Sequence, residues 1–179
     1  MKTISAPADL GGAPLSELKQ WLAITTSNED ALLIDLLAAA HAMCERFTGL
    51  APYLCDVKEI KAVRSMAIPL GVQPVTAFVE ATALGHSFAR RTLTSDDYAI
   101  ETSGDGRTCL VLKVVLPEAQ LELHYRAGQS EDWAGIDAGL RHGIIRFAAH
   151  QYRERDNGDD TTVPAAVAAL WQPYRRMRL

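Results

Sequence analysis

Residues 28–49 read Asn28-Glu-Asp-Ala-Leu-Leu-Ile-Asp-Leu-Leu-Ala-Ala-Ala-His-Ala-Met-Cys-Glu-Arg-Phe-Thr-Gly49. Apolar side chains recur in this stretch every three or four residues, which predicts a helix over 29–48 with one wide buried face. The members of this apolar stripe are Leu32, Leu33, Leu36, Leu37, Ala40, Met43, Cys44 and Phe47. Glu29 and Asp30 stand where the helix dipole favours acids, and Gly49 fits the position just after a helix.

A shorter helix is predicted before the long one. Pro14 suits the first turn of a helix, and four apolar residues at helical spacing follow it, Leu15, Leu18, Trp21 and Leu22. Thr25-Thr-Ser-Asn28 breaks this helix and offers caps for the next. Residues 1–13 are rich in small residues and contain Gly11-Gly12, so we expect a mobile arm there.

Two more helices are predicted towards the C-terminal end. A helical stripe over about 136–155 contains Ile136, Leu140, Ile144, Phe147 and Ala148. Gly139 and Gly143 weaken this helix, although their four-residue spacing would let another helix approach closely. Pro164 opens a short fourth helix through about Leu170, and Pro173 ends it. Because the 29–48 and 136–155 helices each carry an apolar stripe, we expect them to pack together.

The pattern changes between about residues 54 and 128. Short runs with loose alternation are separated by Pro69, Gly71 and Pro74, which is typical of short strands and edge strands. Asp105-Gly106 is a hairpin signal. We expect five or six short antiparallel strands here. The predicted fold class is therefore α+β, with a small bundle of about four helices (1–53 and 129–179) and an inserted antiparallel β lobe (54–128).

The overall composition is that of an ordinary globular protein. The chain has 179 residues, a mass of 19.5 kDa, a net charge of −4 and a pI of about 5.7. An acidic balance argues against a dedicated nucleic-acid-binding domain, which is usually basic. Three cysteines without a CxxC pair do not suggest a disulfide framework, and they favour a reducing cytoplasm. We expect neither a signal peptide nor a membrane span, because no sufficiently long apolar run is present.

Residues that could carry chemistry are scattered. The histidines His41, His86, His124, His142 and His150 form no metal-binding pair. Asp96-Asp97 is better explained by a turn, because adjacent strand residues point to opposite faces. Asp156, Asp159 and Asp160 faintly suggest a cation loop but lack the calcium-loop order. Nucleotide-binding and nucleophile-elbow motifs are absent from the sequence. The sequence therefore predicts no catalytic residue, no cofactor and no metal, and the protein is not expected to be an enzyme.

The C-terminal segment is the exception to this absence of sites. It combines aromatic and apolar residues with three arginines, and we name as docking candidates Trp171, Tyr174, Arg175, Arg176, Met177, Arg178 and Leu179. Tyr and Arg are enriched among binding hot spots. A segment of this kind becomes ordered when it forms charge-assisted hydrogen bonds with a partner. A frayed terminus is the alternative that the composition leaves open.

Several segments, in order and spacing, resemble the head–tail connector (adaptor) proteins of tailed bacteriophages and gene transfer agents. The similar segments are Trp21-Leu22, Phe47-Thr-Gly49, Pro74-Val75, Tyr98, Tyr125-Arg-Ala-Gly128, Tyr152-Arg-Glu-Arg155, Leu170 and Pro173-Tyr-Arg175. Some connectors are almost purely helical, and the β segment resembles the subgroup in which a β-insertion is present.

The resemblance implies a structural protein of the neck, assembled in the bacterial cytoplasm. Such a connector forms a ring of about twelve copies beneath the portal protein, as a closed cyclic assembly. The ring extends the DNA channel and presents a surface to the next ring or tail-completion (stopper) protein. DNA would pass through without sequence-specific binding, and an acidic chain suits that role because a basic lumen would hold phosphates. The resemblance also implies that the C-terminal docking candidates reach the portal.

Two other classes remain open from the sequence. One is a tail-completion adaptor that binds a single partner without forming a ring. The other is a small hydrolase with its site in the β lobe, which would need a pocket with convergent polar groups.

Overall fold

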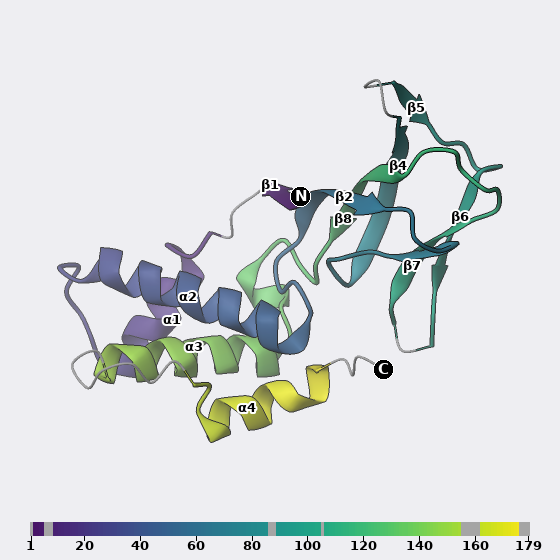
Figure 1. Cartoon of the computed structure of the whole chain (residues 1–179). Coiled ribbons are helices and arrows are strands. Elements are labelled where there is room, and N and C mark those ends of the chain that lie inside the picture. Colours follow the sequence, from purple (N-terminus) through teal and green to yellow (C-terminus); the bar gives the residue numbers. More distant parts are fainter. Residues whose placement is uncertain (1, 6–8, 86–88, 105, 155–161, 176–179) are drawn as a thin grey trace. The chain divides into compact units, whose positions relative to one another are not determined.

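The computed structural model describes residues 2–5, 9–85, 89–104, 106–154 and 162–175. The chain divides into two compact units (Figure 1). A helical unit comprises Ala8–Tyr53 and Gln129–Leu179, and a β unit comprises Met1–Pro7 and Leu54–Gly128. Each unit therefore combines segments that are distant in the sequence.

Helices make up the regular structure of the first unit. In chain order they are α1 (Ala13–Leu22), α2 (Asp30–Thr48), the 3-10 helix η1 (Trp133–Gly135), α3 (Ala138–Arg153), α4 (Ala165–Trp171) and the 3-10 helix η2 (Gln172–Tyr174). Helix α3 contacts α1, α2 and α4 (Figure 1). The predicted packing of the two long helices is confirmed, and α3 is the central element of this unit.

The stripe predicted on α2 is largely correct but too wide. Leu33, Leu37, Ala40 and Cys44 are fully buried in the helical core. Leu32, also assigned to the stripe, is 41 % exposed. The reason is geometric, because Leu32 lies about 100° around the helix from Leu33 and the core covers a narrower arc.

Helix ends follow local backbone chemistry. Gly49 has a φ of 75°, and its amide donates to the carbonyl oxygen of Glu45. This left-handed conformation suits glycine, which has no β-carbon to clash. At the start of α3, the Asp137 carboxylate accepts the amide of Gly139 at 2.9 Å, so Asp137 caps the helix. Helix α3 begins at Ala138, two residues later than predicted, because η1 precedes it.

Two antiparallel sheets make up the β unit. The strands are β1 (Lys2–Ser5), β2 (Cys55–Ala62), β3 (Ala67–Pro69), β4 (Val75–Leu84), β5 (Arg90–Thr92), β6 (Tyr98–Thr102), β7 (Thr108–Leu112) and β8 (Gln120–Ala127). One sheet has the order β1-β2-β8-β4-β5 and the other β3-β7-β6. The α+β fold class is therefore confirmed.

Alternating burial places the core of the larger sheet on one face. Strand β8 buries Leu121, Leu123, Tyr125 and Ala127, while the residues between them are more exposed. Its neighbours β2 and β4 run antiparallel to it over nearly its whole length. Two irregularities in register interrupt β4, between Val75 and Ala77 and between Phe78 and Glu80.

The expectation of a mobile arm over residues 1–13 is wrong for its first part and for its end. Lys2–Ser5 pairs with β2 as an antiparallel strand, and α1 already begins at Ala13. The free edge of β2 offers hydrogen-bonding groups to Lys2–Ser5. This segment therefore forms a strand although its own sequence shows little alternation of apolar and polar residues. The helix starts before Pro14 because proline is tolerated in the first turn.

The strand region holds more strands than the five or six predicted. Within the described part of residues 54–128 there are seven. Arg90–Thr92 escaped prediction because all three of its residues are exposed and so lack alternation. The hairpin predicted at Asp105-Gly106 does join β6 to β7, with the Ser103 amide donating to Arg107 at 2.8 Å; Asp105 itself lies outside the described residues.

Candidate docking surfaces

The predicted docking segment follows α3 and packs on it as far as Arg175. Helix α4 ends at Trp171, and Gln172–Tyr174 continues as one turn of 3-10 helix that contains Pro173. Arg175 then adopts an extended backbone conformation. Arg176, Met177, Arg178 and Leu179 lie outside the described residues.

Trp171 has no exposed surface, so its side chain is a core residue of the helical unit. Its ring contacts Phe47 at 5.8 Å and Phe147 at 6.1 Å between centroids. Its indole Nε1 donates to the carbonyl oxygen of Leu140 at 3.4 Å. Through these contacts Trp171 packs the end of α4 against α2 and α3.

The two glycines of α3 explain how the C-terminal segment comes so close. A β-carbon at position 143 would lie 2.0 Å from Nε1 of Trp171. A β-carbon at position 139 would lie 2.6 Å from the Tyr174 hydroxyl oxygen. The sequence spacing predicted a close approach by another helix, and these positions receive the aromatic side chains of α4 and η2.

Tyr174 and Arg175 complete this attachment. The Tyr174 hydroxyl donates to the Asp137 carboxylate that caps α3. This hydrogen bond lowers the pKa of Asp137 and raises the pKa of Tyr174. The Arg175 guanidinium lies 5.5 Å from the centre of the Phe47 ring, within cation–π range. The chain is therefore held against the helical unit up to Arg175.

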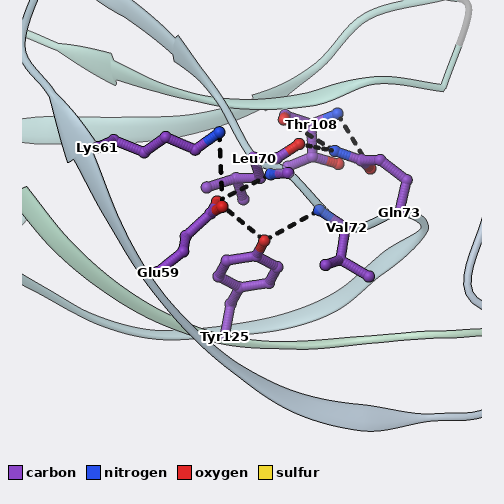
Figure 2. Close-up of polar contacts among 8 residues, drawn as sticks. Glu59, Lys61, Leu70, Val72, Gln73, Thr108 and Tyr125 are labelled. Atoms are coloured by element: carbon purple, nitrogen blue, oxygen red, sulfur yellow. Dashed lines mark hydrogen bonds and ion pairs between the residues drawn. The ribbon is translucent and has the colours of Figure 1, made fainter. Parts of the chain in front are cut away.

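The β unit contains a buried polar cluster (Figure 2). Glu59 is 4 % exposed, and its carboxylate accepts the Gly71 amide at 2.8 Å and the Tyr125 hydroxyl at 3.0 Å. Lys61 Nζ lies 3.5 Å from the other oxygen of Glu59. The Tyr125 hydroxyl in turn accepts the Val72 amide at 3.1 Å. Burial, with the Glu59 charge second, raises the pKa of Tyr125 above its ordinary range.

A second set of bonds continues this cluster into the smaller sheet (Figure 2). The Gln73 amide nitrogen donates to the carbonyl oxygens of Leu70 at 3.2 Å and Thr108 at 3.1 Å. The Leu70 amide also donates to Thr108 at 3.1 Å. Residues 70–73 are thus bound to β2, β7 and β8. This cluster links the two sheets of the β unit, because residues 70–73 form hydrogen bonds with strands of both sheets. Its polar groups are hydrogen-bonded to one another.

Candidate catalytic and metal-binding residues are not brought together. In the described ranges, three or more His, Cys, Asp or Glu side chains nowhere gather closely enough to hold a metal ion. Asp97 has the turn role favoured by the sequence, accepting the Thr94 amide at 2.9 Å. His86 and the acidic residues Asp156, Asp159 and Asp160 lie outside the described residues. His41 is half-buried, with its Nε2 atom shielded from solvent, and this burial lowers its pKa to about 4.

Clefts lined by described residues of the helical unit include one along α1 and one beside Trp21. The larger, of about 400 Å³, lies along α1, and its Lys19 pairs with Asp30 at 2.6 Å. The smaller, of about 290 Å³, is lined by Trp21, Arg146, His150, Arg153, Glu154, Pro164, Ala166 and Val167. We call it the Trp21 cleft. Sequence reasoning missed it, because its residues come from three helices that only the fold brings together.

No helix in the described part of the chain is long and apolar enough to cross a membrane. No protein-family model matches the sequence, and no curated protein matches it.

Solved structures do match, over the whole chain. A chain from the neck of an empty gene transfer agent (GTA) particle, determined with C6 symmetry, has a TM-score of 0.83 at 19 % identity. A chain from the virion of the native GTA particle has a TM-score of 0.83 at 21 % identity. A chain from the native neck, determined with C12 symmetry, has a TM-score of 0.80 at 19 % identity. Each alignment covers 100 % of this chain and 97 % of the other. The fold of these particle proteins is therefore the fold of this protein.

Proposed function

We propose that this protein is a structural head–tail connector of a phage or phage-like particle. The observation that carries the proposal is the full-length structural similarity, which includes both the helical and the β unit, to chains of GTA necks and virions. The connector resemblance of the sequence points the same way. The role is structural rather than catalytic.

The proposed assembly is a ring of about twelve copies beneath the portal. One similar chain belongs to a neck determined with C12 symmetry and another to a neck determined with C6 symmetry, and a twelve-fold ring is compatible with both. In this arrangement the four helices form the bundle of the ring and DNA passes through its lumen. The next ring or stopper protein binds on the side away from the portal.

Portal docking is assigned to the end of the chain. Trp171, Tyr174 and Arg175 attach the preceding residues to the helical unit. Arg176, Met177, Arg178 and Leu179 then offer cations and apolar side chains to the portal. Losing one desolvated arginine pair costs about 2–5 kcal/mol per subunit, and a ring multiplies this effect by avidity.

Particle production in cells that lack the native gene tests the connector role. We expect particles from such cells to have filled heads without tails, and expression of the chain to restore the tails. Mass spectrometry of purified restored particles should find the chain in the neck. A chain that is absent from particles, with tails unaffected by the loss of the gene, would contradict the proposed function.

Docking is tested separately by removing residues 176–179, which leaves the contacts of Trp171, Tyr174 and Arg175 in place. We expect unchanged thermal unfolding and loss of tail attachment. The matched variants replace Arg176 and Arg178 either with Gln, which removes the charge, or with Lys, which keeps it. The Gln variant should fail and the Lys variant should keep partial function, because lysine lacks the bidentate geometry of arginine. Unchanged portal affinity after truncation would defeat the docking assignment.

A further inference from the structure

Two large apolar side chains are exposed in the described part of the helical unit. Trp21 of α1 is 44 % exposed and Leu32 of α2 is 41 % exposed. Single exposed apolar residues are ordinary on protein surfaces, so their surroundings decide whether they mark an interface. Trp21 lies beside several basic residues, whereas Leu32 lies beside a single acid, Asp35.

The surroundings of Trp21 are basic. Its ring meets His142 edge-on, with centroids 5.3 Å apart. His142, Arg146, His150 and Arg153 follow one another at helical spacing, so they share one face of α3. Within the described ranges neither Arg146 nor Arg153 forms an ion pair, and Glu154 is the one acidic residue that lines the Trp21 cleft. Pro164 and Val167 give the cleft apolar walls.

Leu32 is surrounded by small side chains and one acid. The exposed residues on this side of α2 are Ala31, Leu32, Asp35, Ala38, Ala39 and Ala42, and we call them the α2 outer face. Asp35 is the single charged residue between positions 31 and 42. Among the residues the structure describes, it has no cationic partner within ion-pair distance. Small side chains around it allow another surface to approach the helix closely.

These two surfaces occupy different sides of the helical unit. Helix α3 contacts both α2 and α4, and it lies between them in Figure 1. The α2 outer face points away from the core that Leu33, Leu37 and Ala40 share with α3. The Trp21 cleft is instead bounded by α3 and α4. Each copy therefore carries two unlike surfaces. The α2 outer face contains Asp35, and the Trp21 cleft contains Arg146 and Arg153, all without an ion-pair partner among the described residues.

We propose that the α2 outer face of one copy docks in the Trp21 cleft of the next copy. Leu32 packs against Trp21 and Pro164, and Asp35 pairs with Arg146 or Arg153. Contacts between unlike faces repeat from copy to copy and close into a ring when the rotation allows. This inference rests on the proposed function, because it names the surfaces through which the connector ring forms.

Charge and shape favour a second copy over DNA as the occupant. The chain has a net charge of −4, which opposes binding of a phosphate backbone. Phosphates also need no apolar cleft, whereas a tryptophan beside arginines is the composition of a protein–protein hot spot. Asp35 and Leu32 stand three residues apart, on one side of their helix, so an acid and an apolar anchor can enter together.

Charge exchange tests the pairing. The variants Asp35→Arg, Arg146→Glu and Arg153→Glu are each made as the only copy in particle-producing cells, and connector copies per particle are counted by mass spectrometry. Since repulsion replaces attraction at every contact of the ring, we expect Asp35→Arg and at least one arginine variant to lower the count by about 10-fold or more. Combining Asp35→Arg with the defective arginine variant should restore the count to within about 3-fold of wild type, because the pair is re-formed with opposite signs.

The control variants are Glu101→Arg and Arg64→Glu, which change the net charge equally at exposed positions of the β unit. They should assemble normally. Circular dichroism of each purified variant separates misfolding from loss of assembly. Because Arg146 is half-buried, the exposed Arg153 provides a second variant that is safe for folding.

Normal counts for Asp35→Arg would overturn the inference, whatever the arginine variants do. That result, with defective arginine variants, would assign the cleft to DNA phosphates or to another protein. A loss that the combined variant does not repair would also overturn it. In each of these outcomes, mass spectrometry still finds the wild-type chain in the neck of the particle. If the proposed function itself is wrong, the wild-type chain is absent from the neck.

Discussion

A β-carbon at position 143 would lie 2.0 Å from Nε1 of Trp171, closer than non-bonded heavy atoms approach. Glycine is therefore required on α3 for a sterically simple reason, although glycine weakens helices by about 1 kcal/mol. The compensation is the burial of the whole Trp171 ring between Phe47 and Phe147. The single residue Gly143 thus decides where the C-terminal segment attaches.

We predict that Gly143→Ala lowers the free energy of unfolding. Overpacking costs about 1–3 kcal/mol, and the better helix propensity of alanine recovers up to about 1 kcal/mol of this. Urea denaturation followed by circular dichroism measures the difference. Gly104→Ala is the control, because a β-carbon there meets nothing within 4 Å. Equal stability of the two variants would mean that Trp171 does not pack on α3 as described.

His41 gives a prediction on pH. Burial lowers its pKa from 6.5 to about 4, so the folded state disfavours the charged imidazole. Below pH 6.5 the unfolded chain takes up the proton first, and stability is therefore present above this pH and lost as the pH falls towards 4. The loss approaches about 3 kcal/mol at 1.36 kcal/mol per unit. His41→Gln should flatten the dependence of thermal stability on pH between 6.5 and 4; an unchanged slope would contradict the burial of His41.

At the scale of elements, the helices followed from periodicity, and the strands followed only in part. The helices α2 and α3 each bury one stripe, which sequence spacing records directly. Strands β1 and β5 could not be found this way. Lys2–Ser5 is a strand because it pairs with the edge of β2, and Arg90–Thr92 is a strand because it pairs with the edge of β4. Pairing between distant segments leaves little trace in a short exposed run.

The same reasoning explains which parts of the site the sequence predicted. Aromatic and basic composition pointed to the C-terminal segment, but not to the burial of Trp171. The Trp21 cleft combines residues from α1, α3 and α4 that are more than 140 positions apart at the extremes, from Trp21 to Val167. A local sequence pattern cannot predict this cleft, because only tertiary packing brings its residues together.

Strand β1 gives the prediction at this scale. Deleting residues 2–7 removes the partner of β2, whose register with β1 extends from Asp56 to Glu59. We expect amide hydrogen exchange in Asp56–Glu59 to accelerate by at least about 10-fold, because a newly exposed edge opens more easily. Exchange in Leu121–Tyr125 of the central strand β8 serves as the internal reference. Unchanged protection in β2 would show that β1 does not hold this edge.

At the scale of the whole molecule, both units expose large apolar side chains at their described surfaces, namely Trp21 and Leu32 in the helical unit and Met66, Val79, Val114 and Val115 in the β unit. The β unit is held internally by the Glu59–Tyr125–Gln73 cluster, whose polar groups satisfy one another. In the helical unit, the charges of Asp35, Arg146 and Arg153 have no ion-pair partner among the described residues. Single exposed apolar side chains of this kind are ordinary on the surface of a monomer.

This balance predicts how the isolated protein behaves. The proposed contact between copies buries one tryptophan cleft and a few charges, which is modest for a stable free complex. A portal ring that holds many copies side by side raises their effective concentration and closes the ring without stronger contacts. We therefore expect a monomer at micromolar concentration by native mass spectrometry and a ring in electron-microscopy maps of the particle. Because an isologous contact closes after two copies, a stable two-fold dimer in both settings would refute the ring and, with it, the proposed face-to-cleft contact.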